Sequence, residues 1–290
     1  MKIMITGCNG QVGRSLVKQL TGKAELLAVD YQDLDITQQQ AVMQSVTKFK
    51  PDFIINAAAH TAVDKAEQEI EASYAINRDG PKYLAEAAQQ CDAVMLHIST
   101  DYVFDGEGSQ AYNESDLTGP QGVYGESKLA GEQAVAQACD KHLILRTAWV
   151  FGEQGNNFVK TMLRLAESRD ELNIVDDQFG GPTYASDIAA ALIKMAEKVN
   201  SGAEVDWGIY HFSGMPYASW FDFAKAIFSA AENQGVLEKQ PTVSAIPTSA
   251  YPTPAKRPAN SRMNCSKISQ QFGIQPSDWQ QALQNIAAYK

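Results

Sequence analysis

A glycine-rich turn after the first apolar segment limits what this chain can fold into. The segment Lys2–Thr6 is apolar and β-branched, as expected of a strand, and the turn after it opens a helix with an apolar stripe. In such a turn one glycine permits the bend, a second lets backbone approach a pyrophosphate, and a third lets helix pack on strand. The N–H groups at the helix start also attract phosphate. We therefore expect a dinucleotide-binding loop lined by Gly7, Gly10, Gln11, Val12 and Gly13.

An acidic residue closes the second expected strand, Leu26–Asp30, at the distance from the glycine turn that dinucleotide-binding proteins use. The Asp30 carboxylate can accept hydrogen bonds from the adenosine ribose 2′-hydroxyl, and it would repel a 2′-phosphate. No arginine follows it to compensate, because the next residues are Tyr31–Asp33. We therefore predict NADH or NADPH as cofactor, with NADH preferred. Asp35 and Ile36 are expected near the adenine.

Short apolar runs alternate with longer amphipathic segments through the first half of the chain. Further strands are expected at Asp52–Ala59, Ala93–Thr100 and His142–Val150. A helical segment over Glu67–Gln90 is expected to break at Gly80-Pro81, because proline interrupts helices. The alternation is typical of βαβ units around a parallel sheet. We therefore predict an α/β fold, with a Rossmann-type doubly wound parallel sheet in a dinucleotide-binding domain over residues 1–150.

The pattern changes after residue 150 to helices separated by irregular segments that carry Gly and Pro. Expected elements are helices at Asn157–Glu167, Ser186–Val199 and Trp220–Ala231 and a strand at Gly208–Phe212. Pro241–Asn264 lacks a helical period and is expected to be an extended, ligand-lining segment. We predict that residues 151–290 form mainly a smaller mixed α/β domain for the second ligand, with some segments returning to the first domain.

A hydroxyl, a phenol and an amine are expected to meet at one end of the sheet. Thr100 lies at the carboxyl end of a predicted strand, where parallel sheets bind ligands. Tyr124 and Lys128 lie four residues apart on a predicted helix, and therefore on one face. A nearby cation brings the pKa of a tyrosine closer to neutrality, which suits proton transfer. We expect Thr100, Tyr124 and Lys128 to be catalytic, with Lys128 also bonding the nicotinamide ribose.

Charge and cysteine usage exclude several classes of partner. The chain has 34 acidic and 24 basic residues, a formal charge of −10, so nucleic acid or an anionic membrane would be repelled. Four cysteines without a Cys-x-x-Cys pair and four histidines without ligand spacing predict neither disulfides nor a metal site. No apolar run is long enough to span a membrane. We expect a cytoplasmic protein.

Longer motifs carry a resemblance to a known family. They are Asn56–Glu67 (NAAAHTAVDKAE), Ser99–Phe104 (STDYVF), Arg146–Phe151 (RTAWVF) and Pro247–Pro254 (PTSAYPTP). With the glycine turn and the Tyr-x-x-x-Lys pair, they make the chain resemble the extended short-chain dehydrogenases/reductases, and among these the dTDP-4-dehydrorhamnose reductase family. The resemblance runs from the glycine turn almost to the C-terminus.

The resemblance implies a reaction and a set of contacts. The implied activity is NAD(P)H-dependent reduction of the C4 ketone of dTDP-6-deoxy-L-lyxo-4-hexulose to dTDP-L-rhamnose, with Tyr124 donating the proton. The second domain would then bind a sugar nucleotide. The residues implied beside the cofactor are Ala59, His60 and Thr61. Those implied at the sugar are Thr100, Asp101, Tyr124 and Trp149.

The diphosphate of such a substrate needs local cations, because the protein is acidic overall. The segment Lys256–Arg262 offers them, and Arg257 and Asn260 are our candidates for substrate contacts. The resemblance links magnesium to a homodimer. Ser15 stands where a carboxylate ligand would be wanted, so the sequence does not support a magnesium site. A homodimer is left open.

Two other activities stay open on the sequence. A sugar-nucleotide epimerase uses the same three catalytic groups, and a non-catalytic regulatory subunit resembles this reductase family. A dehydratase is disfavoured, because its members carry an acid where this chain has Tyr102. Net oxidation of NADH by the keto sugar would distinguish a reductase from an epimerase or a subunit.

Overall fold

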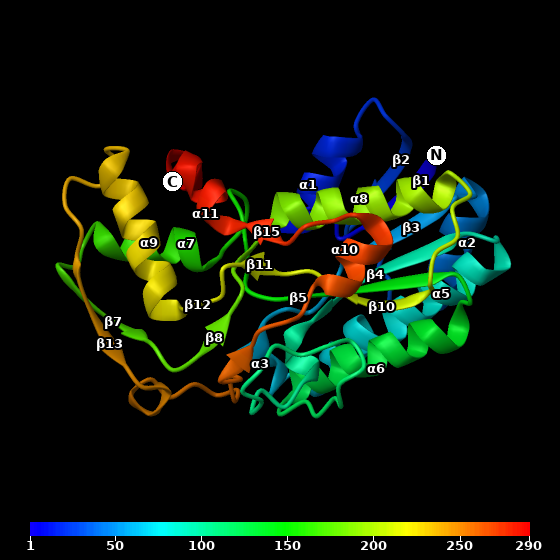
Figure 1. Cartoon of the computed structure of the whole chain (residues 1–290). Helices are drawn as coiled ribbons and strands as arrows, with labels where there is room; N and C mark the ends of the chain where they lie inside the picture. Colours follow the sequence, from blue (N-terminus) through cyan, green and yellow to red (C-terminus); the bar gives the residue numbers. More distant parts are fainter.

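A parallel sheet runs through the computed structural model, which describes residues 1–290 (Figure 1). Its six strands lie in the order β10-β5-β4-β3-β1-β2, and all neighbours are parallel. They are β1 Lys2–Thr6, β2 Glu25–Val29, β3 Phe53–Asn56, β4 Val94–Thr100, β5 His142–Thr147 and β10 Gly208–His211. Because β2 and β3 flank β1, the winding reverses there, where such sheets bind ligands. The predicted Rossmann-type sheet is confirmed.

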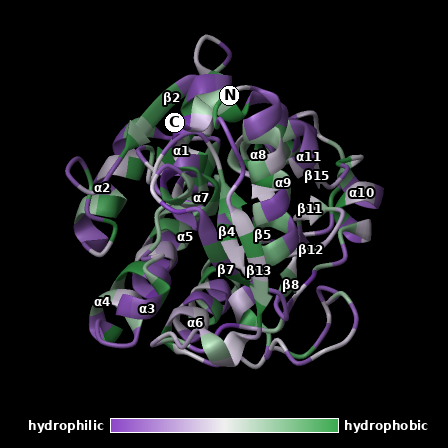
Figure 2. Ribbon diagram, turned by 90° about the vertical axis from the view of Figure 1, so that its left-hand side faces the viewer, coloured by the Kyte–Doolittle hydropathy of each residue, from purple (hydrophilic) through white to green (hydrophobic).

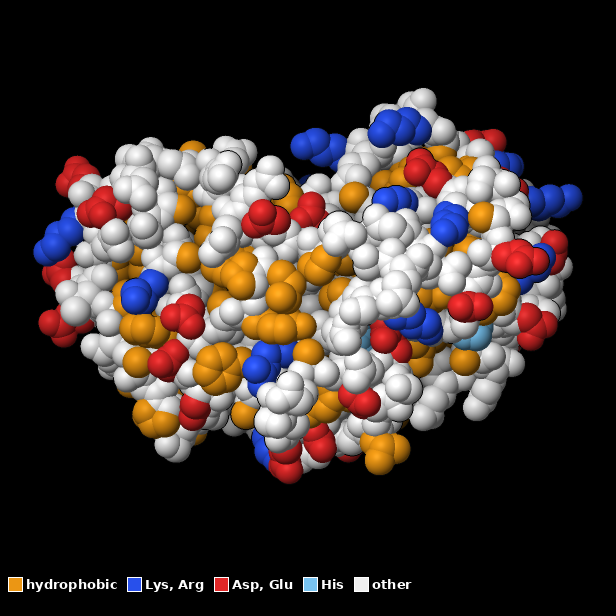
Figure 3. Space-filling model, in the orientation of Figure 1, with side chains coloured by type: hydrophobic (Ala, Val, Ile, Leu, Met, Phe, Trp, Pro, Cys, Tyr) orange, Lys and Arg blue, Asp and Glu red, His pale blue; other side chains and the backbone are white.

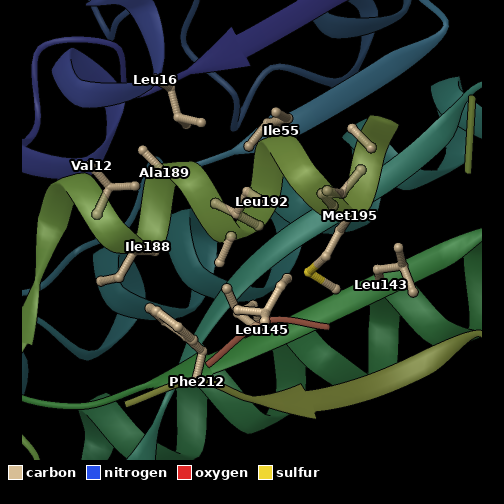
Figure 4. Packing of buried hydrophobic residues seen from close by; sticks show 14 of the residues in the cluster. Val12, Leu16, Ile55, Leu143, Leu145, Ile188, Ala189, Leu192, Met195 and Phe212 are labelled. Atoms are coloured by element: carbon tan, nitrogen blue, oxygen red, sulfur yellow. The ribbon is translucent and has the colours of Figure 1, made fainter. Parts of the chain in front are cut away.

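Alternate residues of each strand face two different helical layers. Ile3 of β1 packs with α1, α8 and α10, whereas Met4 packs on the opposite face with α2, α5 and α6. The helices are α1 Gln11–Leu20, α2 Gln39–Phe49, α5 Gly80–Gln90, α6 Val123–Ala138, α8 Ala185–Asn200 and α10 Ser266–Phe272. Figure 4 shows Leu192 and Met195 of α8 beside Leu145 of β5. Figure 2 shows that the strands are hydrophobic and that the helices around them are mixed in hydropathy.

A second group of elements lies to the left of the sheet in Figure 1. It contains α7 (Phe158–Ala166), α9 (Trp220–Asn233) and the parallel pair β7 (Glu171–Val175) and β13 (Thr242–Ile246). Its buried residues, Phe223 among them, form a separate hydrophobic cluster. By contrast α8 and β10, although they follow residue 150, pack with the six-stranded sheet. The domain boundary at residue 150 itself stays a prediction.

The remaining elements of the chain are short. They are α3 Val63–Ala66, α4 Ile70–Tyr74, β6 Val150–Phe151, β8 Phe179–Gly180, β9 Thr183–Tyr184, β11 Gly214–Met215, β12 Ala218–Ser219, β14 Asn260–Ser261, β15 Ser277–Asp278 and α11 Trp279–Ala282. Single-turn or 3₁₀ segments cover Asp101–Val103, Thr248–Ala250 and Leu283–Tyr289. No helix combines the length and the apolar character that crossing a bilayer requires.

The predicted helix break at Gly80-Pro81 is wrong. The chain stays helical from α4 through a π-helical turn at Ala75–Asp79 into α5. Pro81 is the second residue of α5 and follows the π-helical turn, so the helical hydrogen bonding is already irregular where its N–H is missing. A methyl group on Gly80 would lie 2.6 Å from the side chain of Ile36, so glycine lets the helix pack closely there.

Two strands are shorter than predicted. The strand expected over His142–Val150 ends at Thr147, because Trp149 takes a φ of 49° and turns the chain. The strand expected over Asp52–Ala59 ends at Asn56, whose side-chain oxygen accepts from the backbone N–H of Ala58 at 3.1 Å. Both turns lie at the carboxyl edge of the sheet and help to form the site there.

Candidate active site

The glycine turn lies where β1 and β3 end. A methyl group on Gly7 would be 2.6 Å from the backbone nitrogen of Ala58, and one on Gly13 would be 2.1 Å from the Gly7 oxygen. Gly7 also has a φ of +71°, which L side chains rarely adopt. Gly10 is less crowded, with the Gly7 oxygen at 3.3 Å. The close packing at Gly7 and Gly13 and the α1 N-terminus beyond them fit a pyrophosphate-binding loop.

Asp30 is anchored beside this turn. Its carboxylate accepts from the backbone N–H of Asn9 and of Tyr31, both at 2.8 Å. Arg14 of α1 donates from Nε to the Asn9 oxygen at 2.8 Å, so a cation stands on the same turn. Arg14 is not among the predicted site residues, because a compensating cation was expected only in the residues that follow Asp30.

Asp35 and Ile36 each contact neighbouring groups of the protein. One carboxylate oxygen of Asp35 accepts from the backbone N–H and the hydroxyl of Thr37, at 3.0 and 2.7 Å. Ile36 is 6% exposed and packs against Gly80. A contact with adenine therefore stays a prediction for both, and for Ile36 the observed role is core packing.

Thr100, Asp101 and Tyr124 meet at the carboxyl end of β4. The Thr100 hydroxyl donates to Asp101 Oδ1 at 2.9 Å, and it lies close enough to the Tyr124 phenol to influence the pKa of that phenol. Burial raises the pKa of Asp101 to about 6. Burial also raises the pKa of Tyr124 above its usual range. The ring of Tyr102 packs edge-on against that of Tyr124, with centroids 5.4 Å apart.

Lys128 is buried one turn after Tyr124 on α6. Its side chain is enclosed, and Nζ donates to the backbone oxygen of Ile98 at 2.7 Å. Burial lowers the pKa of Lys128 to about 8, and Glu132 acts in the opposite direction. The expectation that Lys128 lowers the pKa of Tyr124 differs from the structure, in which burial and Asp101 raise it. The amine and the phenol share a helix face, as predicted, but the amine is bonded to the strand.

The loop Ala59–Thr61 between β3 and α3 is fixed by a residue that the sequence analysis missed. Buried Asn77 accepts from the His60 N–H at 2.8 Å and donates to the His60 oxygen at 3.1 Å. The His60 ring lies 2.9 Å from the Ser73 hydroxyl and 3.1 Å from Glu69. The ring nitrogens of His60 therefore face protein groups, and the loop is ordered by them.

Trp149 stacks on an aromatic ring from the second group of elements. Its ring lies 3.6 Å from that of Trp220, the first residue of α9, at an interplanar angle of 8°. A methyl group on Gly180 would lie 2.5 Å from Trp149, so this glycine makes room for the indole. Trp220 gave no sequence signal, because only the fold brings the two rings together.

The side chains predicted to bind the diphosphate already have partners within the protein. Arg257 bonds Asp64 at 2.8 Å, with side chains 32% and 40% exposed. The Asn260 amide donates to the Gln110 oxygen at 2.7 Å and accepts from Arg262 at 2.7 Å. In Figure 3, cations and carboxylates are interspersed over the face shown, with hydrophobic side chains towards its middle. No three His, Cys, Asp or Glu side chains are grouped to hold a metal ion.

The glycine turn, the Thr100 strand end and the Tyr124–Lys128 helix lie at one edge of a parallel sheet. This combination defines an NAD(P)-dependent oxidoreductase of the extended short-chain dehydrogenase/reductase class. A family model described as the RmlD substrate binding domain matches residues 1–289. The chain belongs to the dTDP-4-dehydrorhamnose reductase family.

Relatives of known activity agree over the whole chain. The chain is 56% identical to the dTDP-4-dehydrorhamnose reductase of Aggregatibacter actinomycetemcomitans, with 99% of each chain covered. It is 44% identical to that of Escherichia coli K12, with 97% of this chain and 95% of the relative covered. The function is therefore that of an NAD(P)-dependent dTDP-4-dehydrorhamnose reductase in dTDP-L-rhamnose biosynthesis.

Solved structures give the same picture. The reductase from Clostridium acetobutylicum has a TM-score of 0.92 and 42% identity, with 99% of this chain and 98% of that chain covered. The reductase from Bacillus anthracis, in complex with NADP, has a TM-score of 0.91 and 36% identity, with 100% and 99% covered. A UDP-glucose 4-epimerase from Thermus thermophilus, at 19% identity, shares the fold alone.

Proposed function

We propose that Tyr124 protonates the C4 oxygen of the keto sugar, with Thr100 and Lys128 assisting. The bound NAD(P)H supplies the hydride. The observation that carries the assignment is the placement of the Tyr124 phenol beside the Thr100 hydroxyl at the carboxyl end of β4. A phenol whose pKa is raised holds its proton at neutral pH, so it can serve as a general acid.

Thr100 would orient that proton. The Thr100 hydroxyl gives its hydrogen to Asp101 and accepts from the Tyr102 N–H at 3.3 Å, so its oxygen keeps one lone pair for a further donor. A sugar oxygen that enters between the Thr100 and Tyr124 hydroxyls would be the acceptor for the Tyr124 proton. We assign to the Lys128 ammonium a bond to the nicotinamide ribose and a positive charge near the developing phenolate.

The glycine turn and the Ala59–Thr61 loop are the proposed cofactor contacts, and the sugar nucleotide would lie across Asp101 and Trp149. Arg257 is the proposed diphosphate cation, supported by its partial exposure. To bind there, the diphosphate would have to replace Asp64 as the partner of Arg257. For Asn260 we keep a substrate contact as a weaker proposal, since both ends of its amide are bonded within the protein.

We propose that NADH is preferred because the anchored Asp30 carboxylate would repel a 2′-phosphate. Arg14, on the same turn, would moderate that repulsion, so NADPH should also be used. The preference is measured as kcat/KM with NADH divided by kcat/KM with NADPH, and Asp30→Asn should lower this ratio. If the wild-type ratio favours NADPH, the proposal is wrong. The homodimer likewise stays a prediction, which sedimentation analysis would test.

The direct test follows NADH consumption with the dTDP-keto sugar for wild type and Tyr124→Phe. We expect turnover to fall by at least about 10²-fold, the usual contribution of a general acid. Cofactor affinity should change little, because the substitution removes only a hydroxyl. Tyr102→Phe is a matched control from the neighbouring ring; its hydroxyl faces Arg257 at 3.5 Å, so turnover is compared at saturating substrate and should stay close to wild type. Equal rates in wild type and Tyr124→Phe would refute the assignment of Tyr124.

A further inference from the structure

A row of buried polar side chains lies beneath α6, the helix that carries Tyr124 and Lys128. It begins at Thr6 of β1, continues through Asn56 of β3 and His97 of β4, and ends at Lys128 of α6. The successive distances are 2.7 Å from Thr6 Oγ1 to Asn56 Oδ1, 3.0 Å from Asn56 Nδ2 to His97 Nδ1, and 3.5 Å from His97 Nε2 to Lys128 Nζ. His97 is 0% exposed and Lys128 is 2% exposed, so solvent does not separate them.

The direction of the hydrogen bonds in this row is fixed by a backbone group. The N–H of Ala58 can only donate, and it lies 3.1 Å from Asn56 Oδ1. The oxygen end of the Asn56 amide therefore faces Ala58 and Thr6, and the NH₂ end faces His97. Since Nδ2 donates, His97 Nδ1 must accept and carries no hydrogen.

The tautomer of His97 follows from that acceptor. A neutral imidazole carries its single hydrogen on the other nitrogen, Nε2. Burial and the adjacent Lys128 hold the pKa of His97 well below its usual range, so the ring stays neutral. The Nε2–H group therefore faces Lys128 Nζ. It meets a lone pair when the amine is neutral, and another donor when the amine is an ammonium.

Besides this neutral ring, one charged group acts on Lys128. Glu132 lies one turn further along α6 and favours the ammonium. Its carboxylate is held by Arg146 of β5, with bonds of 2.8 and 2.7 Å, which limits that influence. On the strand side the amine has only the Ile98 oxygen and the His97 ring. Burial is the largest influence against the charged form, and the ring N–H at 3.5 Å is a polar group that adds to it.

We propose that Asn56 and His97 are positioning residues that set the protonation equilibrium of Lys128 by holding a ring N–H against its amine. Asn56 fixes the tautomer, and the tautomer disfavours the ammonium. The inference rests on the proposed role of Lys128 in the reaction. It predicts that the loss of activity at high pH occurs earlier than it would without the ring N–H.

Histidine side-chain ¹⁵N signals test the tautomer without any activity measurement. The full-length chain has four histidines, and His97→Asn identifies the His97 signals by their loss. We expect a protonated Nε2 and an unprotonated Nδ1, unchanged across the pH range in which Lys128 titrates. A protonated Nδ1, or a ring that becomes charged near neutral pH, would overturn the inference.

Two substitutions test the effect on Lys128. His97→Asn can still accept from Asn56 but presents nothing to the amine, so the basic limb of the kcat/KM profile should move up by about one pH unit. His97→Gln reaches the amine and can turn its oxygen towards the ammonium, so the shift should be larger. His142→Gln, at the start of β5 and away from Lys128, is the matched control and should leave the limb in place.

The outcomes separate this inference from the assignment on which it rests. If Tyr124→Phe is inactive but neither His97 variant moves the basic limb, the inference fails and the catalytic assignment survives. If Tyr124→Phe is as active as wild type, the assignment fails, while the ¹⁵N signals still decide the tautomer. Should a variant unfold, as judged by circular dichroism, the ¹⁵N measurement on the wild-type chain remains decisive.

Discussion

Two ion pairs of this protein lie in contrasting surroundings. Glu132 of α6 and Arg146 of β5 are 3% and 2% exposed, and the guanidinium makes two hydrogen bonds to the carboxylate. Asp64 and Arg257, near the proposed diphosphate site, are 40% and 32% exposed. The first pair supports the helix that carries Tyr124 and Lys128. The second lies on the surface that the diphosphate would reach in the proposed function.

The difference shows that burial decides whether an ion pair is fixed in the fold or can exchange its partner. Removing one partner of a buried pair leaves the other desolvated and uncompensated, whereas an exposed pair is screened by water and separates easily. A pair that water reaches can therefore give up its cation to a diphosphate. The buried pair cannot, so it acts on the reaction only by holding α6 against the sheet.

The largest expected effect comes from breaking the buried pair. Glu132→Gln leaves the Arg146 charge unpaired, and we expect the free energy of unfolding to fall by about 3–5 kcal/mol. Glu107→Gln, which breaks the exposed contact with Lys256, is the control and should have little effect. Urea denaturation measures both. Similar losses for the two variants would contradict the comparison.

A smaller effect is expected at a buried carboxyl that has no cation bonded to it. The pKa of Asp101 is raised from 3.8 to about 6, so the folded state binds its proton more tightly than the unfolded state does. This contribution to stability is present at low pH and is lost as the pH rises through about 6. Asp101→Asn should therefore unfold less easily than wild type above pH ~7, by up to about 3 kcal/mol.

That gain should vanish as the pH falls to about 3, below the ordinary pKa of 3.8, where the wild-type carboxyl is protonated in both states. Denaturation of both proteins over this range gives the measurement. A constant difference at all pH values would show that packing, and not ionisation, is responsible.

Removing the exchangeable cation should weaken substrate binding. Arg257→Ala loses a charge-assisted hydrogen bond of about 1.5–3 kcal/mol, so KM for the dTDP-keto sugar should rise about 10- to 100-fold. kcat should change little, because the diphosphate that Arg257 would hold takes no part in the reaction at C4. Steady-state kinetics at fixed NADH distinguish the two constants, and a fall in kcat alone would contradict the role.

The smallest effect has the opposite sign. Asp64→Asn keeps the acceptor for the Ala255 N–H but removes the charge that competes for Arg257. Because an exposed pair contributes about 0–1 kcal/mol, KM should fall by about fivefold at most. A rise in KM would mean that Asp64 positions Arg257 for the ligand, and does not compete with it.

The sequence predicts the parts of the site that depend on local spacing. The glycine turn, the strand end at Thr100 and the Tyr124–Lys128 pair are each set by neighbours within one strand, turn or helix. Periodicity also predicts α8 within one residue at each end, because its apolar stripe is long. These elements needed no knowledge of the rest of the chain.

Contacts between distant segments could not be predicted in this way. Asn77 binds the His60 loop and Trp220 stacks on Trp149, each from a different element. A residue type has no fixed spacing to such a partner. The predicted break at Pro81 failed for a related reason, since packing of Gly80 on Ile36 holds the helical path.

The return of α8 and β10 to the sheet constrains how this architecture can be recombined. A fragment that stopped near residue 150 would leave Leu143 and Leu145 without the α8 side chains that cover them. Exchanging the sugar-recognising part for another would thus require replacing stretches on both sides of α8 and β10. Diversity of substrates on this scaffold is accordingly expected to arise by changes within loops, and not by cutting and joining at one point.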